Sequence, residues 1–175
     1  MGRINDISLV TQVTVFRNRR AFDQLVREYQ SPIRRFFLSQ TLGNEALSDD
    51  LSQDTFLKAY TCIGQYRGTA SFLTWLMRIA YNVWYDHCRR NKTEVEVKPE
   101  MMKTSHDTLN IDICQALAQL KEEERTCITL QLIDGYSISE IADITRMPEN
   151  TVKSHLKRGK EKTANYLREN GYDRR

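Results

Sequence analysis

A tight turn joins two short amphipathic segments between Gly135 and Gly159, and it strongly constrains the fold of the C-terminal half. Ser137 is placed to cap the first segment, and Glu140 three residues later completes a capping box. Pro148 suits the opening turn of a second helix, where its missing N–H leaves no bond unmade. The spacing therefore predicts a helix-turn-helix. Its inward residues are Ile138, Ile141, Ala142, Val152 and Leu156.

The outward face of the second helix carries hydrogen-bond donors and positive charges, which suit base edges and phosphates. From Thr151 to Arg175 there are eight lysines and arginines against three acidic residues, whereas the whole chain has a net charge of only +3. This concentration of charge favours a DNA-binding surface over an ordinary helical hairpin with a basic, solvated face. The outward residues are Asn150, Thr151, Lys153, Ser154 and Lys157.

The composition indicates a globular protein of 175 residues, long enough for one large core or two small ones. No apolar run is long enough to span a bilayer, and the N-terminus lacks the features of a signal peptide. The four cysteines (Cys62, Cys88, Cys114 and Cys127) form no Cys-x-x-Cys pair, and three of them fit apolar helical patterns. We therefore expect a cytoplasmic protein with no direct membrane insertion.

Prolines and glycines are scarce, and nearly all of them stand at plausible element boundaries. Helical periodicity predicts helices over residues 21–40, 48–60 and 71–90. Residues 6–16 fit a helix, although their apolar positions also alternate as in a strand. Pro32 predicts a kink or a break in the first long helix.

Residues 92–107 are polar, have no sustained period and contain a central Pro99, so they are predicted to form a flexible linker. The helical pattern resumes at Ile111 and runs to the helix-turn-helix. The expected fold is all-α, with two small helical domains over residues 1–91 and 108–175, of which the C-terminal one carries the helix-turn-helix.

The predicted helix over residues 71–90 has two unlike faces. One face is apolar, whereas the other mixes aromatic, amide and cationic groups. Unpaired bases bind to such a surface, because rings stack on bases, amides read their edges and cations hold the backbone. The alternative is that the aromatic residues are only half-buried packing residues. The apolar face comprises Phe72, Leu76, Ile79, Ala80 and Val83, and the mixed face comprises Ser71, Trp75, Arg78, Asn82, Tyr85 and Arg89.

The helix predicted over residues 48–60 has an acidic face, which is expected to meet a protein because it would repel phosphate. A merely solvated face is the alternative. Leu51, Phe56 together with Thr55, and Ala59 are expected to pack inward. The residues expected to be exposed are Asp49, Asp50, Gln53, Asp54 and Lys58.

These motifs resemble the extracytoplasmic-function (group IV) sigma factors of bacterial RNA polymerase, in the sigma-70 family. The resemblance covers the chain from about Phe22 to Leu167. The promoter-melting domain of that family is matched by Asp50-Leu51-x-Gln53-Asp54-x-Phe56-Leu57-x-Ala59, Tyr66-Arg67-Gly68 and Phe72-x-Thr74-Trp75-Leu76-x-Arg78-Ile79-Ala80-x-Asn82. Its C-terminal domain is matched by Ser137-Ile138-x-Glu140-Ile141-Ala142 and Pro148-x-x-Thr151-Val152-Lys153-Ser154.

The resemblance implies a sigma factor that binds core RNA polymerase, recognises promoter DNA and helps to melt it for transcription initiation. The implied partners are the β′ clamp helices and β flap of the polymerase, promoter DNA and an anti-sigma factor, often a membrane-bound one. Polymerase would be bound by Asp50, Gln53, Asp54 and Phe56. The single strand at the −10 element would be held by Arg67, Thr69, Ser71, Trp75, Arg78 and Asn82, with one base turned out into a pocket. The −35 duplex would be read by Glu149, Asn150, Thr151, Lys153, Ser154, Lys157 and Arg158.

Two residues depart from the family pattern. Arg146 stands in the turn where glycine is usual, and a left-handed backbone is costly for arginine. Either the turn is built differently or Arg146 is strained, in a position to contact phosphate. Leu120-Lys121 replaces the usual Leu-Pro, which leaves the start of the next helix open.

Two other classes of protein fit the sequence less well. A free-standing helix-turn-helix regulator would not need a single-strand surface in its N-terminal half. An enzyme is disfavoured because His87, Cys88, His106 and His155 lack zinc-ligand spacing and no glycine-rich phosphate loop occurs. We therefore expect no catalytic residue, no metal and no cofactor.

Overall fold

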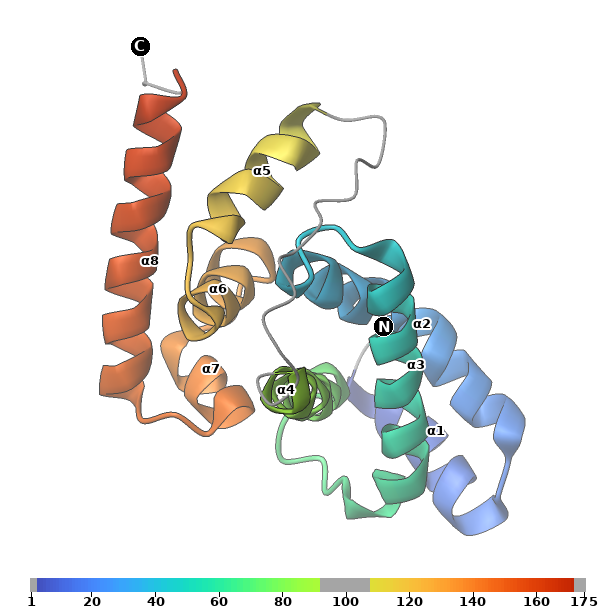
Figure 1. The fold of residues 1–175 in the computed structure, drawn as a ribbon. Helices are drawn as coiled ribbons and strands as arrows, with labels where there is room; N and C mark the ends of the chain where they lie inside the picture. The colour runs from blue at the N-terminus through green and yellow to red at the C-terminus, as the bar shows by residue number, and fades with distance from the viewer. Residues whose placement is uncertain (1–2, 92–107, 172–175) are drawn as a thin grey trace. The chain divides into compact units, whose positions relative to one another are not determined.

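The computed structural model describes residues 3–91 and 108–171, and every regular element in these ranges is helical. The predicted all-α class is thus confirmed. These residues form two compact units: unit 1 combines residues 3–37 with 49–91, and unit 2 combines residues 38–48 with 108–171 (Figure 1). The predicted linker, 92–107, lies outside the described residues. The predicted domain boundaries stay a prediction.

The first half of the chain contains α1 (Arg3–Phe16), α2 (Arg19–Gln40), α3 (Glu45–Cys62), a 3₁₀ turn (Ile63–Gln65) and α4 (Phe72–Asn91). Residues 6–16 are therefore helical, which decides between the two patterns that fit them. No helix in the described ranges is long and apolar enough to cross a membrane.

Helix α2 runs without interruption through Pro32, so the break that this proline allowed does not occur. An interior proline costs a helix about 3 kcal/mol. Burial of each large apolar side chain stabilises the folded state by about 1.5–3 kcal/mol. Helix α2 buries Ile33, Phe36 and Phe37 completely. The apolar stripe of α2 thus outweighs the penalty of Pro32.

Tyr29 links three helices of unit 1. Its hydroxyl donates a 2.8 Å hydrogen bond to the buried carboxylate of Asp6 in α1. Its ring centroid lies 5.4 Å from that of Phe72 at the start of α4. Burial, and then the bond to Asp6, raise the pKa of Tyr29 well above its ordinary value, so the hydroxyl remains a donor. The N-terminal helix is therefore tied to the same core as α4.

Unit 2 contains α5 (Thr108–Ala118), α6 (Glu122–Ile128), a π-helical turn (Thr129–Ile133), α7 (Ile138–Thr145) and α8 (Glu149–Glu169). The Arg125 guanidinium holds the junction of α5 and α6 by donating to the carbonyls of Leu117 at 3.0 Å and Leu120 at 3.1 Å. It also donates to the Gln40 carbonyl at 2.9 Å, within the same unit.

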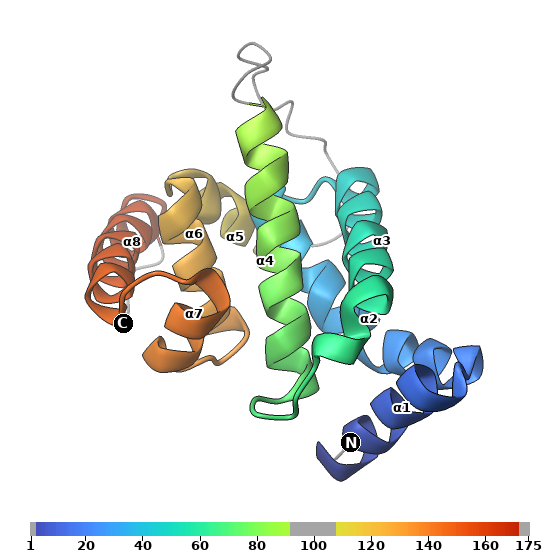
Figure 2. The same cartoon turned by 90° about the horizontal axis from the view of Figure 1, so that it is seen from below.

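Helices α6 and α8 lie side by side in both views of the ribbon (Figures 1 and 2). Gly159 of α8 lies against α6, and an added Cβ there would lie 2.6 Å from Cγ1 of Ile128. A side chain at this position requires the Ile128 side chain or one of the two helices to shift. Glycine at position 159 thus lets α8 pack closely against α6.

We expect Gly159→Ala to destabilise unit 2 by about 1–2 kcal/mol, because overpacking at this crossing outweighs alanine's better helix propensity. Urea unfolding followed by circular dichroism measures the change. The exposed neighbour Lys160 supplies the control, since Lys160→Ala should stay within about 0.5 kcal/mol of the native chain. A Gly159→Ala variant as stable as the native chain contradicts this account of the crossing.

Candidate nucleic-acid interface

The predicted helix-turn-helix is present in unit 2. The Glu140 amide donates to the Ser137 hydroxyl oxygen at 3.3 Å, and the Glu140 carboxylate accepts the Ser137 N–H at 2.9 Å, which confirms the capping box. Helix α7 ends at Arg146, whose left-handed backbone has a φ of 59° and a ψ of 21°. Pro148 is the N-cap residue, one position before the predicted opening turn, and α8 begins at Glu149.

Helix α8 has the two faces that the sequence predicts. Val152, Leu156 and Gly159 are buried, whereas the predicted DNA-reading residues are exposed apart from the half-buried Thr151. The exposed predicted residues are Glu149, Asn150, Lys153, Ser154, Lys157 and Arg158.

Several of these side chains have neighbours within α8. Glu149 and Lys153 form an ion pair at 3.8 Å, which is weak because both side chains are about half exposed. The Ser154 hydroxyl donates to the Asn150 carbonyl at 2.8 Å. Lys157 has no hydrogen-bond or ion-pair partner in the described part of the chain.

Arg158 differs from the other basic residues because it faces a buried acid. Its Nε lies 3.4 Å from a carboxylate oxygen of Glu124, whose side chain is 2% exposed. Lys162 donates to the other oxygen of Glu124 at 2.7 Å. Part of the charge of Arg158 therefore holds α8 against α6, which the sequence pattern does not reveal.

Glu124 also explains the missing proline before α6. The backbone N–H of Lys121 donates to the Glu124 carboxylate at 3.2 Å, and proline has no N–H to give. Burial raises the pKa of Glu124, but the bonds from Lys162 and Lys121 and the charges of Lys162 and Arg158 outweigh it, so the pKa lies below its ordinary value. Glu124 is therefore ionised and starts α6 at Glu122.

The start of α4 in unit 1 is fixed by two polar contacts. The Ser71 hydroxyl oxygen accepts the Thr74 N–H at 3.0 Å and so caps the helix. The Tyr66 hydroxyl donates to the Ala70 carbonyl at 2.9 Å and closes the preceding loop. Ser71, predicted to bind DNA, thus has a structural role at this helix end.

Aromatic packing holds Trp75 in place on the mixed face of α4. The Trp75 ring lies 5.3 Å from Phe72 and 5.7 Å from Tyr66, and Trp75 remains half-buried. Trp84 is buried, as in the packing alternative, whereas Tyr85 is 55% exposed. The surface therefore offers the fixed, half-buried indole of Trp75 and the exposed phenol of Tyr85.

The polar residues of this surface are available to different degrees. Arg67 and Thr69 are exposed in the loop, and Arg78 and Asn82 are half-buried on α4. Within the described residues the Nε of Arg78 is buried and has no hydrogen-bond partner. A buried N–H without a partner costs about 1–3 kcal/mol, so Arg78 is held on α4 at a cost in stability.

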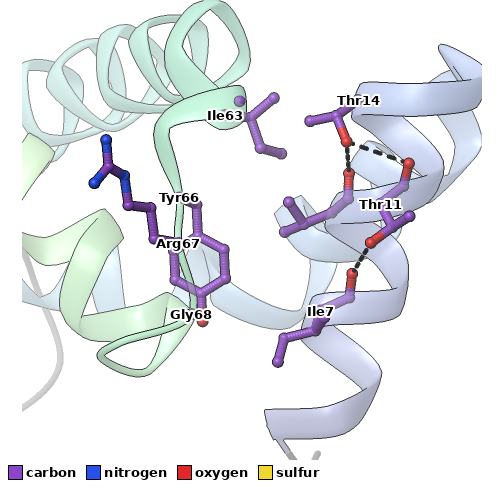
Figure 3. Close-up of a pocket in the computed structure, with 9 residues that line it drawn as sticks. Ile7, Thr11, Thr14, Ile63, Tyr66, Arg67 and Gly68 are labelled. Atoms are coloured by element: carbon purple, nitrogen blue, oxygen red, sulfur yellow. Dashed lines mark hydrogen bonds between the residues drawn. The ribbon is translucent and has the colours of Figure 1, made fainter.

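A cavity of about 240 Å³ lies between α1 and the loop that precedes α4 (Figure 3). The hydroxyls of Thr11 and Thr14 donate to α1 carbonyls, which leaves their oxygen lone pairs as acceptors. Arg67 extends from the loop on the side away from α1 (Figure 3). No sequence signal assigned a site to α1. The lining residues are Ile7, Val10, Thr11, Thr14, Ile63, Gly64, Tyr66, Arg67 and Gly68.

The acidic face of α3 is present, but its inward side differs from the prediction. Thr55 is fully buried between Leu51 and Ala59, and its hydroxyl donates to the Leu51 carbonyl at 2.8 Å. Phe56 is only half-buried, so its predicted inward position is wrong. The inward row of α3 thus runs through Leu51, Thr55 and Ala59, as expected for Thr55, and Phe56 lies at its edge.

An apolar residue also belongs to this acidic face. Asp50, Gln53 and Asp54 are exposed, and Leu57, one turn further along the same face, is 66% exposed. Asp49 instead forms a 2.6 Å ion pair with Arg34 of α2. Leu57 belongs to the family motif, but its sequence position alone assigned it no binding role.

The described residues contain no group of three or more His, Cys, Asp or Glu side chains placed to hold a metal ion. His106, considered above as a ligand, lies outside them.

The fold and the two surfaces define a two-part DNA-binding transcription factor. Two family models match the chain: "Sigma-70 region 2" over residues 25–94 and "Sigma-70, region 4" over residues 112–163. The chain belongs to the sigma-70 family of RNA polymerase sigma factors, in the extracytoplasmic-function (ECF) group. A region 2 match in the N-terminal half disfavours the free-standing regulator.

Known relatives resemble the chain over most of its length. The RNA polymerase sigma-H factor of Pseudomonas aeruginosa is 30% identical over 164 residues, which cover 82% of this chain and 84% of the relative. The ECF sigma factor SigW of Bacillus subtilis is 30% identical over 169 residues, covering 85% and 90%. The solved structure of the sigma factor RpoE from Bartonella quintana, in complex with the anti-sigma factor NepR, has a TM-score of 0.70 at 25% identity and covers 84% and 96%.

The buried carboxylate makes the stability of unit 2 depend on pH. Because the folded pKa of Glu124 is lowered, its contribution is complete above the unfolded value of about 4.3 and is lost as the pH falls through the folded value. Glu124→Gln should destabilise unit 2 by about 1–3 kcal/mol at pH 7, and the difference should shrink below about pH 4.

Urea unfolding at neutral and acidic pH measures this effect. Glu123→Gln, at the exposed neighbouring position, is the matched control and should leave stability nearly unchanged at both pH values. A Glu124→Gln deficit that does not vary with pH would mean that the carboxylate charge is not what stabilises the unit.

Proposed function

We propose that this sigma factor is a non-catalytic subunit of RNA polymerase that acts in the cytoplasm, where it positions the core enzyme on promoters and helps to open them. Residues 1–91 would serve core binding and the −10 element, and residues 108–175 the −35 element. One observation carries the proposal: the same chain holds a basic helix-turn-helix and a second helix whose half-open aromatic, amide and cationic groups suit unpaired bases.

Duplex reading at the −35 element is assigned to α8. Its exposed residues alternate amides and hydroxyls with cations, and the buried face leaves them directed outward. In helix-turn-helix proteins the N-terminal part of the second helix contacts base edges in the major groove. Asn150 and Lys153 therefore contact bases, and Lys157 binds phosphate. Arg158 contributes less, because Glu124 engages it.

Single-strand binding at the −10 element is assigned to α4 and the loop before it. Trp75 offers a ring for stacking, Asn82 an amide for a base edge, and Arg67 a cation for the backbone. Arg78, half-buried on the same face of α4, adds a second cation there. The cavity behind the loop accepts the turned-out base, because its threonine oxygens and apolar wall suit an aromatic ring with donors at its edge (Figure 3).

Polymerase binding is assigned to the acidic face of α3. Asp50, Gln53 and Asp54 meet basic groups of the β′ clamp helices, and Phe56 and Leu57 supply apolar contact. The β flap is assigned to the C-terminal unit. An anti-sigma factor is the expected regulator, since the related RpoE structure holds NepR.

Reconstitution tests the proposal as a whole. The purified chain is mixed with core RNA polymerase and a promoter library, and start-site-specific transcripts are sequenced. The proposal requires new start sites that share −10 and −35 elements. A chain that neither binds the core enzyme nor directs initiation is not acting as proposed.

Asn82→Ala should lower the rate of open-complex formation about tenfold while core binding is unchanged, because one base-edge contact is worth about 1–3 kcal/mol. Permanganate footprinting or a fluorescent base at the −10 element follows opening. Asn91→Ala, which removes the same side chain from the exposed end of α4, is the matched control. Equal opening by the native and Asn82→Ala proteins would remove Asn82 from the base-reading surface.

Leu57→Ala should weaken core-polymerase binding about five- to tenfold without loss of stability, because the side chain is exposed in the free chain and a central apolar contact is worth about 1–2 kcal/mol. Fluorescence anisotropy with labelled chain measures the affinity. Val15→Ala removes a similarly exposed apolar side chain from α1 and should bind normally. Unchanged affinity of Leu57→Ala would exclude this residue from the interface.

A further inference from the structure

Arg146 adopts a backbone conformation that arginine disfavours. Its φ of 59° lies in the left-handed region, where among the described non-glycine residues only Arg17 and Leu42 also lie. The steric cost for such a residue is about 1–2 kcal/mol. The expected strain is therefore real, and the turn is not built in another way.

The turn cannot relax, because the residues on both sides are anchored. Thr145 is buried, donates from its hydroxyl to the Ile141 carbonyl at 2.7 Å and accepts the Met147 N–H at 3.3 Å. Ile144 is completely buried. Glycine or asparagine would adopt the required conformation at lower cost, so the fold itself gives no reason for arginine.

The Arg146 side chain also contributes nothing to packing or pairing. It is exposed and has no hydrogen-bond or ion-pair partner in the described part of the chain. The nearest acid toward α8, Glu149, pairs with Lys153 instead. Arg146 is thus held in a strained conformation, and its charge has no partner in the described part of the chain. Such a combination indicates a functional constraint.

The position of the guanidinium identifies the ligand chemistry. Arg146 lies three residues before the first residue of α8, at the end of the helix that is proposed to enter the major groove. Groups beside an inserted helix meet the sugar-phosphate backbone. Arginine binds phosphate through two parallel N–H donors, which asparagine and glycine cannot supply.

We propose that Arg146 binds a backbone phosphate of the −35 duplex, and that the turn gives up stability to place this charge. The inference rests on the proposed reading of the duplex by α8. It adds to that reading a contact outside the recognition helix that carries no sequence preference.

The test combines stability with binding. The variants compared with the native chain are Arg146→Gly, Arg146→Asn and Arg146→Lys. Thermal unfolding measures the stability of each one. Duplex binding is measured with each reconstituted holoenzyme, on a −35 duplex taken from the promoters that the native holoenzyme selects. We expect the Gly and Asn variants to melt at least as high as the native chain yet to bind about five- to tenfold more weakly. Their plot of log affinity against log salt should be shallower by about one. Arg146→Lys should keep the native salt dependence.

Two further variants separate the possible outcomes. Arg17→Gly relieves the same strain on another arginine and should leave duplex binding unchanged, whereas Lys153→Ala should weaken it. Native binding and salt dependence in Arg146→Gly, with a loss in Lys153→Ala, overturn the role of Arg146 and leave the proposed function standing. An equal loss of duplex binding in Arg17→Gly also overturns the role of Arg146. If Lys153→Ala has no effect either, the proposed reading by α8 fails as well.

Discussion

The close approach of α8 to α6 at Gly159 is the contact on which the DNA-reading surface depends. Gly159 shares the buried face of α8 with Val152 and Leu156, so the rotation of the helix about its axis is fixed there. Once that face is buried, Asn150, Lys153 and Lys157 must point outward. Glu124 strengthens the same contact by pairing with two basic residues of α8. The reading surface thus follows from packing on its opposite side.

In unit 1 the start of α4 depends on a different constraint, a capped helix end set on an aromatic cluster. Ser71 caps α4, and Tyr66, Phe72 and Trp75 pack together around it. Packing from one side leaves the indole half-open on the other. A ring held in this way loses little side-chain freedom when a base stacks on it. The entropic cost of ordering the side chain therefore offsets less of the stacking energy.

Local patterns allowed the fold class, the capping box and the outward residues of α8 to be predicted, because these depend on spacing along a single helix. The errors concern contacts between residues distant in sequence. The apolar pattern could not show that Phe56 would remain half-buried, or that Glu124 would engage Arg158. The cavity beside α1 was beyond prediction for the same reason, since its walls are separated by some fifty residues.

The distribution of charge bears on how the chain finds DNA. Its net charge of +3 is small, and Asp50 and Asp54 place negative charge on the face proposed to bind polymerase. Few phosphate contacts mean weak binding to duplex by the free chain, because affinity rises with the number of counterions released. Glu124 engages Arg158 and Lys162, which reduces the positive charge of α8 that is available to DNA. An arginine in the turn restores one positive charge beside the N-terminal end of α8, which accounts for the steric cost that the turn bears.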